Sequence, residues 1–267
     1  MKSLKALMDL NGRVALITGG AGYIGSVLAE ALAELGANIA VLDNRTPACT
    51  NTAEKIHQMY DVKTLPLPVD LTDEKSVKGT PQIVQDHFGR LDIVINCAAL
   101  VGTSELKGWI APFEEQNTES WRLALEVNLT APFIILQTCS EYLKASGHGS
   151  VINIGSIYGV VGPDMRLYKD ADMGNPAAYA ASKGGLLQLT RWLASVLAPD
   201  VRVNSISIGG VWRNQPEVFQ ERYEKRVPLR RMASEEDLKG AVAYLASDAS
   251  AYVTGHNLVV DGGWTVC

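Results

Sequence analysis

The chain contains 267 residues, of which 47% are apolar and 20% charged, and its formal net charge is −5 at pH 7. This length can hold one large α/β domain or two small ones, and the composition is typical of a globular protein with a substantial core. The acidic balance, with no run of basic residues, argues against nucleic acid or an anionic membrane as a partner.

Cysteine and histidine usage indicates no metal site. The four cysteines, Cys49, Cys97, Cys139 and Cys267, are widely separated and form no CxxC pair, and the four histidines are scattered. We therefore predict no bound metal and a reduced, cytoplasmic protein. The first residues, MKSLKALMDLNGR, carry no signal-peptide cleavage signature, and we expect no apolar stretch long enough to span a bilayer.

Short β-branched runs alternate with longer helical patterns from end to end. Strands are expected at residues 13–18, 38–43, 62–70, 91–98, 150–156, 201–207 and 257–263. Helices are expected at 23–36, 51–59, 72–87, about 118–147, from 175 onward, and after a capping box at 234–237. This alternation, with no linker, predicts one α/β domain spanning residues 1–267. Its fold is predicted to be a single-domain Rossmann fold, a doubly wound parallel sheet of about seven strands with helices on both faces.

The segment LITGGAGYIG places Gly19, Gly22 and Gly25 between the first strand and the first helix. Glycines at this junction let the backbone approach a pyrophosphate on the helix N-terminus, so we predict a dinucleotide-binding loop. Asp43 ends the second strand, at the position expected for a carboxylate that binds the ribose 2′-hydroxyl. NAD is therefore favoured over NADP. Arg45 is either a solvated loop charge or a partner for a 2′-phosphate.

The segment NPAAYAASKGG, residues 175–185, sets a tyrosine and a lysine among small residues. Asn175 and Pro176 suit an N-cap and a first helical position, which places Tyr179 and Lys183 one turn apart on one face. A free phenol has a pKa near 10, and a nearby ammonium favours the phenolate. We predict an acid–base pair rather than a core tyrosine beside a solvated lysine.

Tyr179, Ser182 and Lys183 in YAASK, Ser156 after VINIGS and Asn128 in LEVNLTAPF together resemble the short-chain dehydrogenase/reductase family. The resemblance extends from TGGAGYIG to VVDGGW. It implies that Tyr179 is the general acid/base, that Lys183 tunes it, that Ser156 orients the substrate, and that Asn128 holds a proton-relay water. The predicted cofactor-binding residues are Gly19, Gly22, Tyr23, Ile24, Gly25, Asp43, Asp70, Leu71, Asn96, Ala98, Tyr179, Lys183 and Val211.

Several positions depart from the family pattern. Tyr23 stands where the single-domain branch usually has glycine, and Arg213 stands where a phosphate-binding threonine is frequent. Arg213 could bind the pyrophosphate or a substrate anion. The loop at 159–176 is longer than usual, and it is either a solvated surface loop or a source of polar contacts to a hydroxyl-rich substrate. Its sequence RLYKDADMGNP resembles members linked to bacterial surface-sugar and flagellin-glycan biosynthesis.

These features predict an NAD(H)-dependent oxidoreductase that interconverts a secondary alcohol and a ketone on a sugar or polyol-like substrate. The resemblance implies a homo-oligomer, a dimer or a tetramer. One alternative is an NADPH-dependent 3-oxoacyl-thioester reductase acting on a carrier protein, against which Asp43 and the acidic balance argue. The other is a non-catalytic cofactor-binding regulator.

Overall fold

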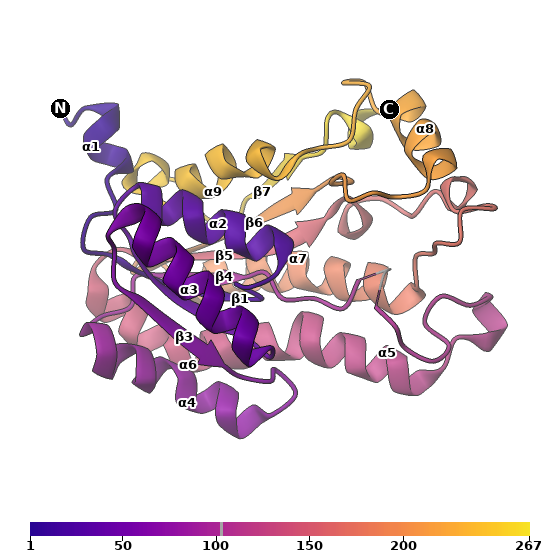
Figure 1. Cartoon of the computed structure of the whole chain (residues 1–267). Coiled ribbons are helices and arrows are strands. Elements are labelled where there is room, and N and C mark those ends of the chain that lie inside the picture. Colours follow the sequence, from indigo (N-terminus) through magenta and orange to yellow (C-terminus); the bar gives the residue numbers. More distant parts are fainter. Residues whose placement is uncertain (102–103) are drawn as a thin grey trace.

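A computed structural model describes residues 1–101 and 104–267. Seven parallel strands form one sheet in the order β3-β2-β1-β4-β5-β6-β7 (Figure 1). The strands are β1 (Val14–Thr18), β2 (Asn38–Asp43), β3 (Thr64–Pro68), β4 (Ile93–Asn96), β5 (Gly149–Ser156), β6 (Val201–Ile208) and β7 (Asn257–Val260). The predicted seven-stranded, doubly wound parallel sheet is confirmed.

Helices cover both faces of this sheet (Figure 1). They are α1 (Leu4–Met8), α2 (Tyr23–Glu34), α3 (Thr46–Tyr60), α4 (Glu74–Phe88), α5 (Thr118–Leu125), α6 (Ala131–Ser146), α7 (Ala177–Leu197), α8 (Glu217–Arg226) and α9 (Lys239–Ala246). Helices α2, α3 and α9 pack on one face, and α4, α6 and α7 pack on the other.

The continuous apolar character of the strands follows from this two-sided burial. In β1, Ala15 and Ile17 point toward the layer of α2, α3 and α9, whereas Val14 and Leu16 point toward α4, α6 and α7. Both faces of the strand are therefore dry, as expected for a parallel sheet inside an α/β domain.

Helices α4 and α7 start later than predicted, and side chains other than the expected ones bond their first N–H groups, whereas α3 starts at Thr46, five residues earlier than predicted. Helix α7 begins at Ala177, with Pro176 at the N-cap position, so the prediction that Asn175 caps this helix is wrong. Instead, Gln116 Oε1 accepts from the backbone N–H of Ala177 at 3.1 Å. Helix α4 is capped by Asp73, and the predicted capping box at 234–237 is confirmed.

One helical stretch, Thr118–Ser146, is long and apolar enough to cross a membrane by length and composition alone, so the expectation that no such stretch exists is wrong. The stretch comprises α5, a π-helical turn at Glu126–Thr130 and α6. Its side chains Ile135, Cys139 and Leu143 are buried against the sheet and the neighbouring helices. This core position accounts for the apolar composition.

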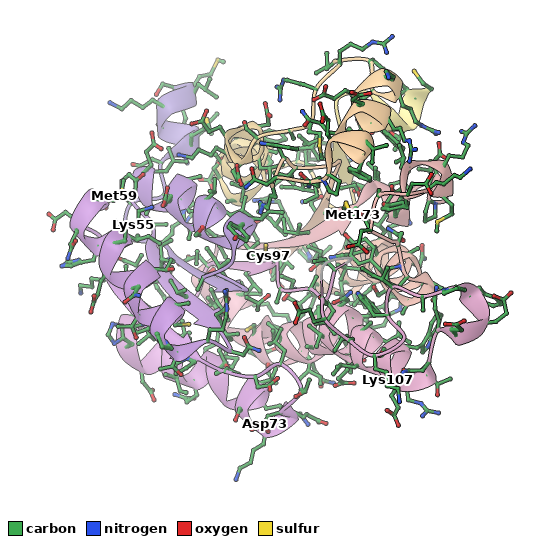
Figure 2. The ribbon with its side chains drawn as sticks, turned by 45° about the vertical axis from the view of Figure 1, so that its right-hand side comes forward. Lys55, Met59, Asp73, Cys97, Lys107 and Met173 are labelled. Carbon is green, nitrogen blue, oxygen red and sulfur yellow. The ribbon has the colours of Figure 1, made fainter. Side chains whose placement is uncertain are left out.

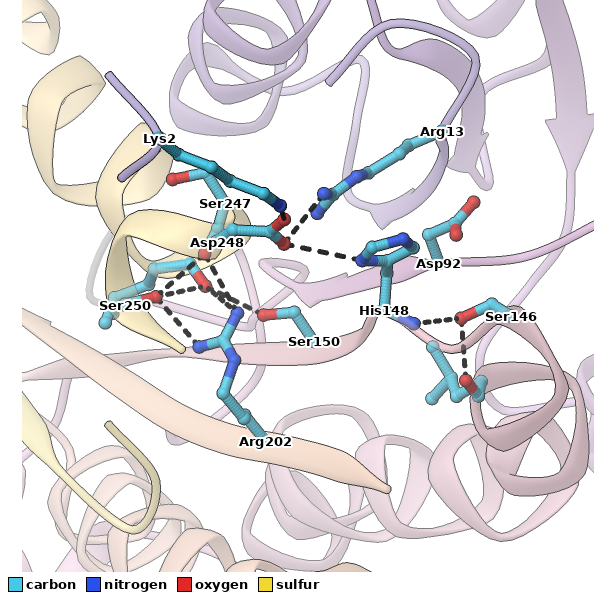
Figure 3. Close-up of polar contacts among 12 residues, drawn as sticks. Lys2, Arg13, Asp92, Ser146, His148, Ser150, Arg202, Ser247, Asp248 and Ser250 are labelled. Carbon is cyan, nitrogen blue, oxygen red and sulfur yellow. Dashed lines mark hydrogen bonds and ion pairs between the residues drawn. The ribbon is translucent and has the colours of Figure 1, made fainter. Parts of the chain in front are cut away.

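At the amino ends of the strands, a group of charged residues ties separate segments together (Figure 3). We call Lys2, Arg13, His148 and Asp248 the amino-end cluster. Asp248 Oδ1 accepts from Arg13 Nη2 at 2.7 Å and lies 3.4 Å from His148 Nδ1, while Lys2 Nζ lies 3.7 Å from Asp248 Oδ2. The cluster joins the N-terminal segment, the start of β1, the start of β5 and the turn after α9.

Candidate active site

A cavity of about 370 Å³ opens at the carboxyl ends of β1 to β4, where the strand order reverses. Ligands of open α/β sheets bind at such a reversal. Nine of the predicted cofactor-binding residues line it: Gly19, Gly22, Tyr23, Ile24, Gly25, Asp43, Asp70, Leu71 and Ala98. Four others do not reach its wall: Asn96, Tyr179, Lys183 and Val211.

Two segments that follow strand ends lie beyond this cavity. Cys97 follows β4 and lines the cavity. In Figure 2, Lys107 and Met173 both lie to the right of Cys97. Lys107 belongs to the segment after β4 and Met173 belongs to the long loop after β5. Gly102 and Thr103 lie outside the described residues.

The loop between β1 and α2 fits a pyrophosphate because it has no room for side chains. Gly19 has φ +63°, and a Cβ there would lie 2.8 Å from the Cα of Ala98. A Cβ on Gly25 would lie 2.1 Å from the carbonyl oxygen of Gly19. Glycine is therefore required at both positions for the turn to close this tightly, as the sequence predicts.

Asp43 and Arg45 form a pair at the mouth of the cavity. Asp43 is only 6% exposed, and Arg45 donates from Nε to Asp43 Oδ1 at 2.9 Å and from Nη2 to Oδ2 at 3.1 Å. Arg45 Nη2 also donates to the carbonyl of Ala21 in the glycine loop at 3.1 Å. The hydrogen bond to Asp43 raises the pKa of Arg45. Arg45 is therefore held against Asp43 and the glycine loop, while 58% of its side chain stays exposed to solvent.

Arg213 faces the same cavity from beyond β6. Its guanidinium lies over the Tyr23 ring, 4.5 Å from the centroid, and its Nη2 lies 3.1 Å from Glu235 Oε1. Among the described residues, its buried Nε has no hydrogen-bond partner. Burial lowers the pKa of Arg213 because it disfavours the charged guanidinium, and an anion beside it would offset that cost. An unpaired donor on this wall suits a phosphate group.

Asp70 has a structural partner. Its Oδ1 accepts from the backbone N–H and the hydroxyl of Thr72, each at 2.9 Å. The carboxylate therefore organises the entry to α4 while it lines the cavity. These contacts describe a role at the entry to α4, and the predicted contact with the cofactor stays a prediction.

Tyr179, Ser156 and Lys183 converge beside α7, as the sequence predicts. Lys183 is 3% exposed; its Nζ lies 5.8 Å from the Tyr179 ring centroid and donates to the carbonyl of Ile154 at 2.7 Å. Ser156, at the end of β5, is buried, and its hydroxyl acts to lower the pKa of Tyr179. The carbonyl of Ile154 therefore holds the ammonium beneath the phenol.

The acid–base properties of this group differ from the prediction. Burial raises the pKa of Tyr179, and the hydrogen bond from Ser156 acts in the opposite direction without outweighing it. Burial also lowers the pKa of Lys183 to about 8. The expected lowering of the phenol's pKa is not seen in the chain by itself, because desolvation decides its direction and Lys183 is not among the groups that shift it. Tyr179 is therefore protonated at neutral pH.

Asn128 lies in the π-helical turn between α5 and α6 and is almost fully buried. Its Oδ1 accepts from the backbone N–H of Leu100 at 2.7 Å, and its Nδ2 donates to the Leu100 carbonyl and to Ser182 Oγ, each at 3.0 Å. π-turns are frequent at functional sites. These three bonds hold the segment after β4 against α7, and the predicted relay water stays a prediction.

Asn96 and Val211 form hydrogen bonds that join the elements around the site. Asn96 Nδ2 donates to Asn153 Oδ1 at 2.8 Å, and Asn153 Nδ2 donates to Thr190 Oγ1 at 2.8 Å, which joins β4, β5 and α7. The Val211 carbonyl accepts from Gln215 Nε2 at 2.8 Å. Both residues position the walls of the site.

Sequence reasoning missed the tyrosine at position 158. It follows Ser156 by two residues, and its backbone N–H donates to Ser156 Oγ at 3.1 Å. Its hydroxyl meets that of Tyr168 from the long loop at 2.8 Å. The available signal was proximity in sequence to the predicted catalytic serine.

Comparison with known proteins agrees with this geometry. A family model described as enoyl-(acyl carrier protein) reductase matches residues 19–265. The trans-4-hydroxycyclohexanecarboxylate dehydrogenase of Sinomonas cyclohexanicum is 34% identical over 95% of this chain and 93% of its own length. The D-threitol dehydrogenase of Mycolicibacterium smegmatis is 30% identical over 96% and 94%.

Solved structures match as closely. An NAD⁺-bound xylitol dehydrogenase superposes with a TM-score of 0.85 at 31% identity, covering 95% of this chain and 99% of that one. The chain belongs to the short-chain dehydrogenase/reductase family. Another family neighbour, a gluconate 5-dehydrogenase from Burkholderia cenocepacia in complex with NADP and tartrate, has a TM-score of 0.87 at 27% identity over 99% and 100%. This chain is accordingly an NAD(P)-dependent alcohol dehydrogenase or ketoreductase.

Proposed function

We propose that this short-chain dehydrogenase/reductase uses NAD(H) to interconvert a secondary alcohol and a ketone on a sugar or polyol-like substrate. The observation that carries the proposal is the convergence of Tyr179, Ser156 and Lys183 next to a cavity with a glycine loop and a buried carboxylate. The relatives named for D-threitol and the neighbour named for xylitol support the substrate class.

The residues around the cavity would hold the dinucleotide by its charged and hydroxylated parts. The loop from Gly19 to Gly25 and the free Nε of Arg213 would bind the pyrophosphate, and Asp43 would bind the adenosine ribose. When bound, the nicotinamide supplies or accepts the hydride. The other predicted contacts, Asp70, Leu71 and Ala98 among them, would shape the adenine and nicotinamide ends.

The protein's own chemistry is a proton exchange at the Tyr179 hydroxyl. Because the pKa of Tyr179 is raised, the protonated phenol can donate to the oxygen of a ketone at neutral pH. Ser156 would hydrogen-bond the same substrate oxygen and stabilise its developing charge. Lys183, held by Ile154, would favour the phenolate left after transfer.

The preference for NAD follows from Asp43. A buried carboxylate repels a 2′-phosphate and can accept hydrogen bonds from both ribose hydroxyls. The alternative, an NADPH-dependent 3-oxoacyl-thioester reductase, would require Arg45 to leave Asp43 and bind the 2′-phosphate. We also propose that residues 1–267 form one catalytic domain, assembled as a dimer or tetramer in the cytoplasm.

The test is to measure dissociation constants for NAD⁺ and NADP⁺, together with turnover over a panel of polyols, sugars and 3-oxoacyl thioesters. We expect NAD⁺ to bind at least tenfold more tightly than NADP⁺. Asp43→Asn should make the two dissociation constants similar. Asp86→Asn, an exposed carboxylate on α4, is the matched control and should leave it unchanged. A preference for NADP⁺ with turnover only of thioesters would overturn the proposal.

A further inference from the structure

An arginine and a tyrosine from distant parts of the chain meet face to face at the cofactor cavity. Tyr23 is the first residue of α2, directly after Gly22 of the glycine loop, and Arg213 follows β6. The guanidinium carbon of Arg213 lies 4.5 Å from the centroid of the Tyr23 ring, which is the distance of a cation–π contact. Both residues line the cavity of about 370 Å³ at the carboxyl ends of β1 to β4.

This contact spans several strands of the sheet. In the strand order, β4 and β5 lie between β1, which leads to Tyr23, and β6, which leads to Arg213. Of the described residues that line the cavity, Arg213 alone comes from the chain after β5. Arg213 therefore reaches the cavity from the side of β6 and meets Tyr23 across it. We call the contact between Tyr23 and Arg213 the strap.

The backbone of Arg213 is held in place by its neighbours in the chain. Its N–H donates to Gln215 Oε1 at 2.6 Å, and Gln215 Nε2 donates to the carbonyl of Val211 at 2.8 Å. Two groups then position the side chain. The Tyr23 ring covers one face of the guanidinium, and Glu235 Oε1 lies 3.1 Å from Nη2 and attracts its charge.

Tyr23 contributes little to the packing of the core. Its side chain is 76% exposed, so the ring removes little apolar surface from water. A long arginine side chain has many rotamers, and stacking on an aromatic face restricts the plane of its guanidinium. The ring is therefore placed to orient Arg213 rather than to stabilise the fold.

One edge of this guanidinium has no hydrogen-bond partner. Nε and Nη2 of Arg213 are both buried and unpaired among residues 1–101 and 104–267, because Glu235 is close to Nη2 without forming a hydrogen bond with it. These two nitrogens lie on the same edge of the guanidinium and can donate in parallel. Arginine binds phosphate in this bidentate manner, so the free edge suits two oxygens of one phosphate group.

We propose that Tyr23 is a positioning residue that holds Arg213 across the cavity, so that the strap retains the pyrophosphate of the bound dinucleotide. The pyrophosphate would contact the glycine loop on one side and the Nε–Nη2 edge of Arg213 on the other. It would leave only when the bidentate contact breaks and Arg213 moves off the Tyr23 ring, so the strap would slow dissociation. The inference rests on the proposed function, because it specifies how the same site retains its cofactor.

The experiment measures the dissociation rate constant of NADH, displaced by excess NAD⁺ and followed by the change in NADH fluorescence. Tyr23→Ala removes the ring and is expected to raise this rate constant about fivefold, as expected for loss of a cation–π contact. Tyr23→Phe keeps the aromatic face and should stay within about twofold of the wild type. The matched control is Tyr252→Ala, which removes a fully exposed ring between α9 and β7 and should leave the rate constant unchanged.

A double-mutant cycle tests whether Tyr23 acts through Arg213. Arg213→Gln alone is expected to raise the dissociation rate constant about tenfold. The variant with both Tyr23→Ala and Arg213→Gln should also show an increase of about tenfold, because the ring has no guanidinium left to hold. Independent effects would instead multiply to about 50-fold.

An unchanged rate constant in Tyr23→Ala, or a multiplied effect in the double variant, would overturn the inference and leave the proposed function intact. A Tyr23→Phe variant that releases NADH as fast as Tyr23→Ala would do the same. The rate constant is a property of folded, NADH-bound molecules, so a lower yield of folded variant does not change it. Absence of NADH binding by the wild-type protein would overturn the proposed function, and the inference with it.

Discussion

The two ends of the parallel sheet treat their polar groups differently. At the amino ends, Asp248 meets Arg13, and Arg202 donates to Ser250 Oγ and to the carbonyls of Leu245 and Ser247 (Figure 3). At the carboxyl ends, Arg213 Nε, Asn175 Oδ1 and Asn96 Oδ1 are buried without partners in the described residues. At the amino end, Arg13 Nη1 is the one buried side-chain atom without a partner among residues 1–101 and 104–267.

This contrast indicates that the polar groups at the amino ends stabilise the fold and that those at the carboxyl ends bind ligands. Buried polar groups are almost always paired, and an unpaired one marks a place where something else binds or where strain is kept. Because the two sets of residues lie at opposite ends of the same sheet, substitutions at the two ends should have separable consequences. Those at the amino end should change unfolding, and those at the carboxyl end should change binding or turnover.

Lys183→Met should produce the largest functional loss at the carboxyl end. We expect kcat to fall by about 100- to 1000-fold, because the phenolate of Tyr179 loses its cation. Lys55→Met, on the outer surface of α3 (Figure 2), is the matched control and should leave kcat unchanged. A loss of less than fivefold would remove Lys183 from the acid–base group.

The same variant tests the burial of the ammonium. The pKa of Lys183 is lowered to about 8 from 10.5, so between these values the unfolded chain binds more protons than the folded one. The free energy of unfolding of the wild-type protein should therefore rise with pH relative to Lys183→Met, by up to about 1.4 kcal/mol per unit. Denaturant titrations at pH 7.5, 8.5 and 9.5 measure this slope; a flat difference would contradict the burial.

Gly25→Ala should weaken dinucleotide binding by about 100-fold, because the new Cβ would displace the Gly19 carbonyl at the phosphate loop. Gly79→Ala in α4 adds a Cβ that meets nothing within 4 Å and should leave binding unchanged. Isothermal titration with NAD⁺ compares the two. Equal binding by both variants would mean that the loop does not contact the pyrophosphate.

Arg213→Gln should weaken NAD⁺ binding by about tenfold, the loss of one charge-assisted hydrogen bond to a phosphate. Arg191→Gln, which removes an exposed guanidinium on α7, should not weaken it. If Arg213→Gln instead raises KM for an anionic substrate and leaves the dissociation constant of NAD⁺ unchanged, Arg213 belongs to the substrate side of the site.

Asp248→Asn should lower the free energy of unfolding by about 1–2 kcal/mol and leave kcat of the folded protein unchanged. Burial acts to raise the pKa of Asp248, but the hydrogen bond and charge of Arg13 outweigh it and lower the pKa below 3.8. The stabilisation should thus persist above pH 3.8 and disappear as pH falls through the folded pKa. Chemical denaturation at pH 3 and pH 7 measures it, and a loss of kcat would contradict the separation of the two ends.

The sequence predicted the fold and much of the site because the decisive patterns are local. The strand periods, the glycine spacing and the Tyr179–Lys183 turn each lie within one or two elements, and Asp43 is the last residue of its strand. Helix caps were harder to predict from sequence, since the residue that bonds the first N–H group of α7, Gln116, comes from a distant segment.

What the sequence could not predict depends on three-dimensional surroundings. The raised pKa of Tyr179 comes from desolvation, and desolvation depends on how the whole fold packs around the side chain. The pairing of Asp43 with Arg45 and the meeting of Tyr158 with Tyr168 likewise depend on side-chain directions that no linear motif records.

The most direct test of proton donation by Tyr179 is the rate of single-turnover ketone reduction by Tyr179→Phe. The dissociation constant of NADH is determined on the same sample. Loss of the hydroxyl that donates the proton should slow ketone reduction by about 1000-fold and change the dissociation constant of NADH by less than twofold. A variant that reduces the ketone at the wild-type rate would contradict the assignment of the proton donor.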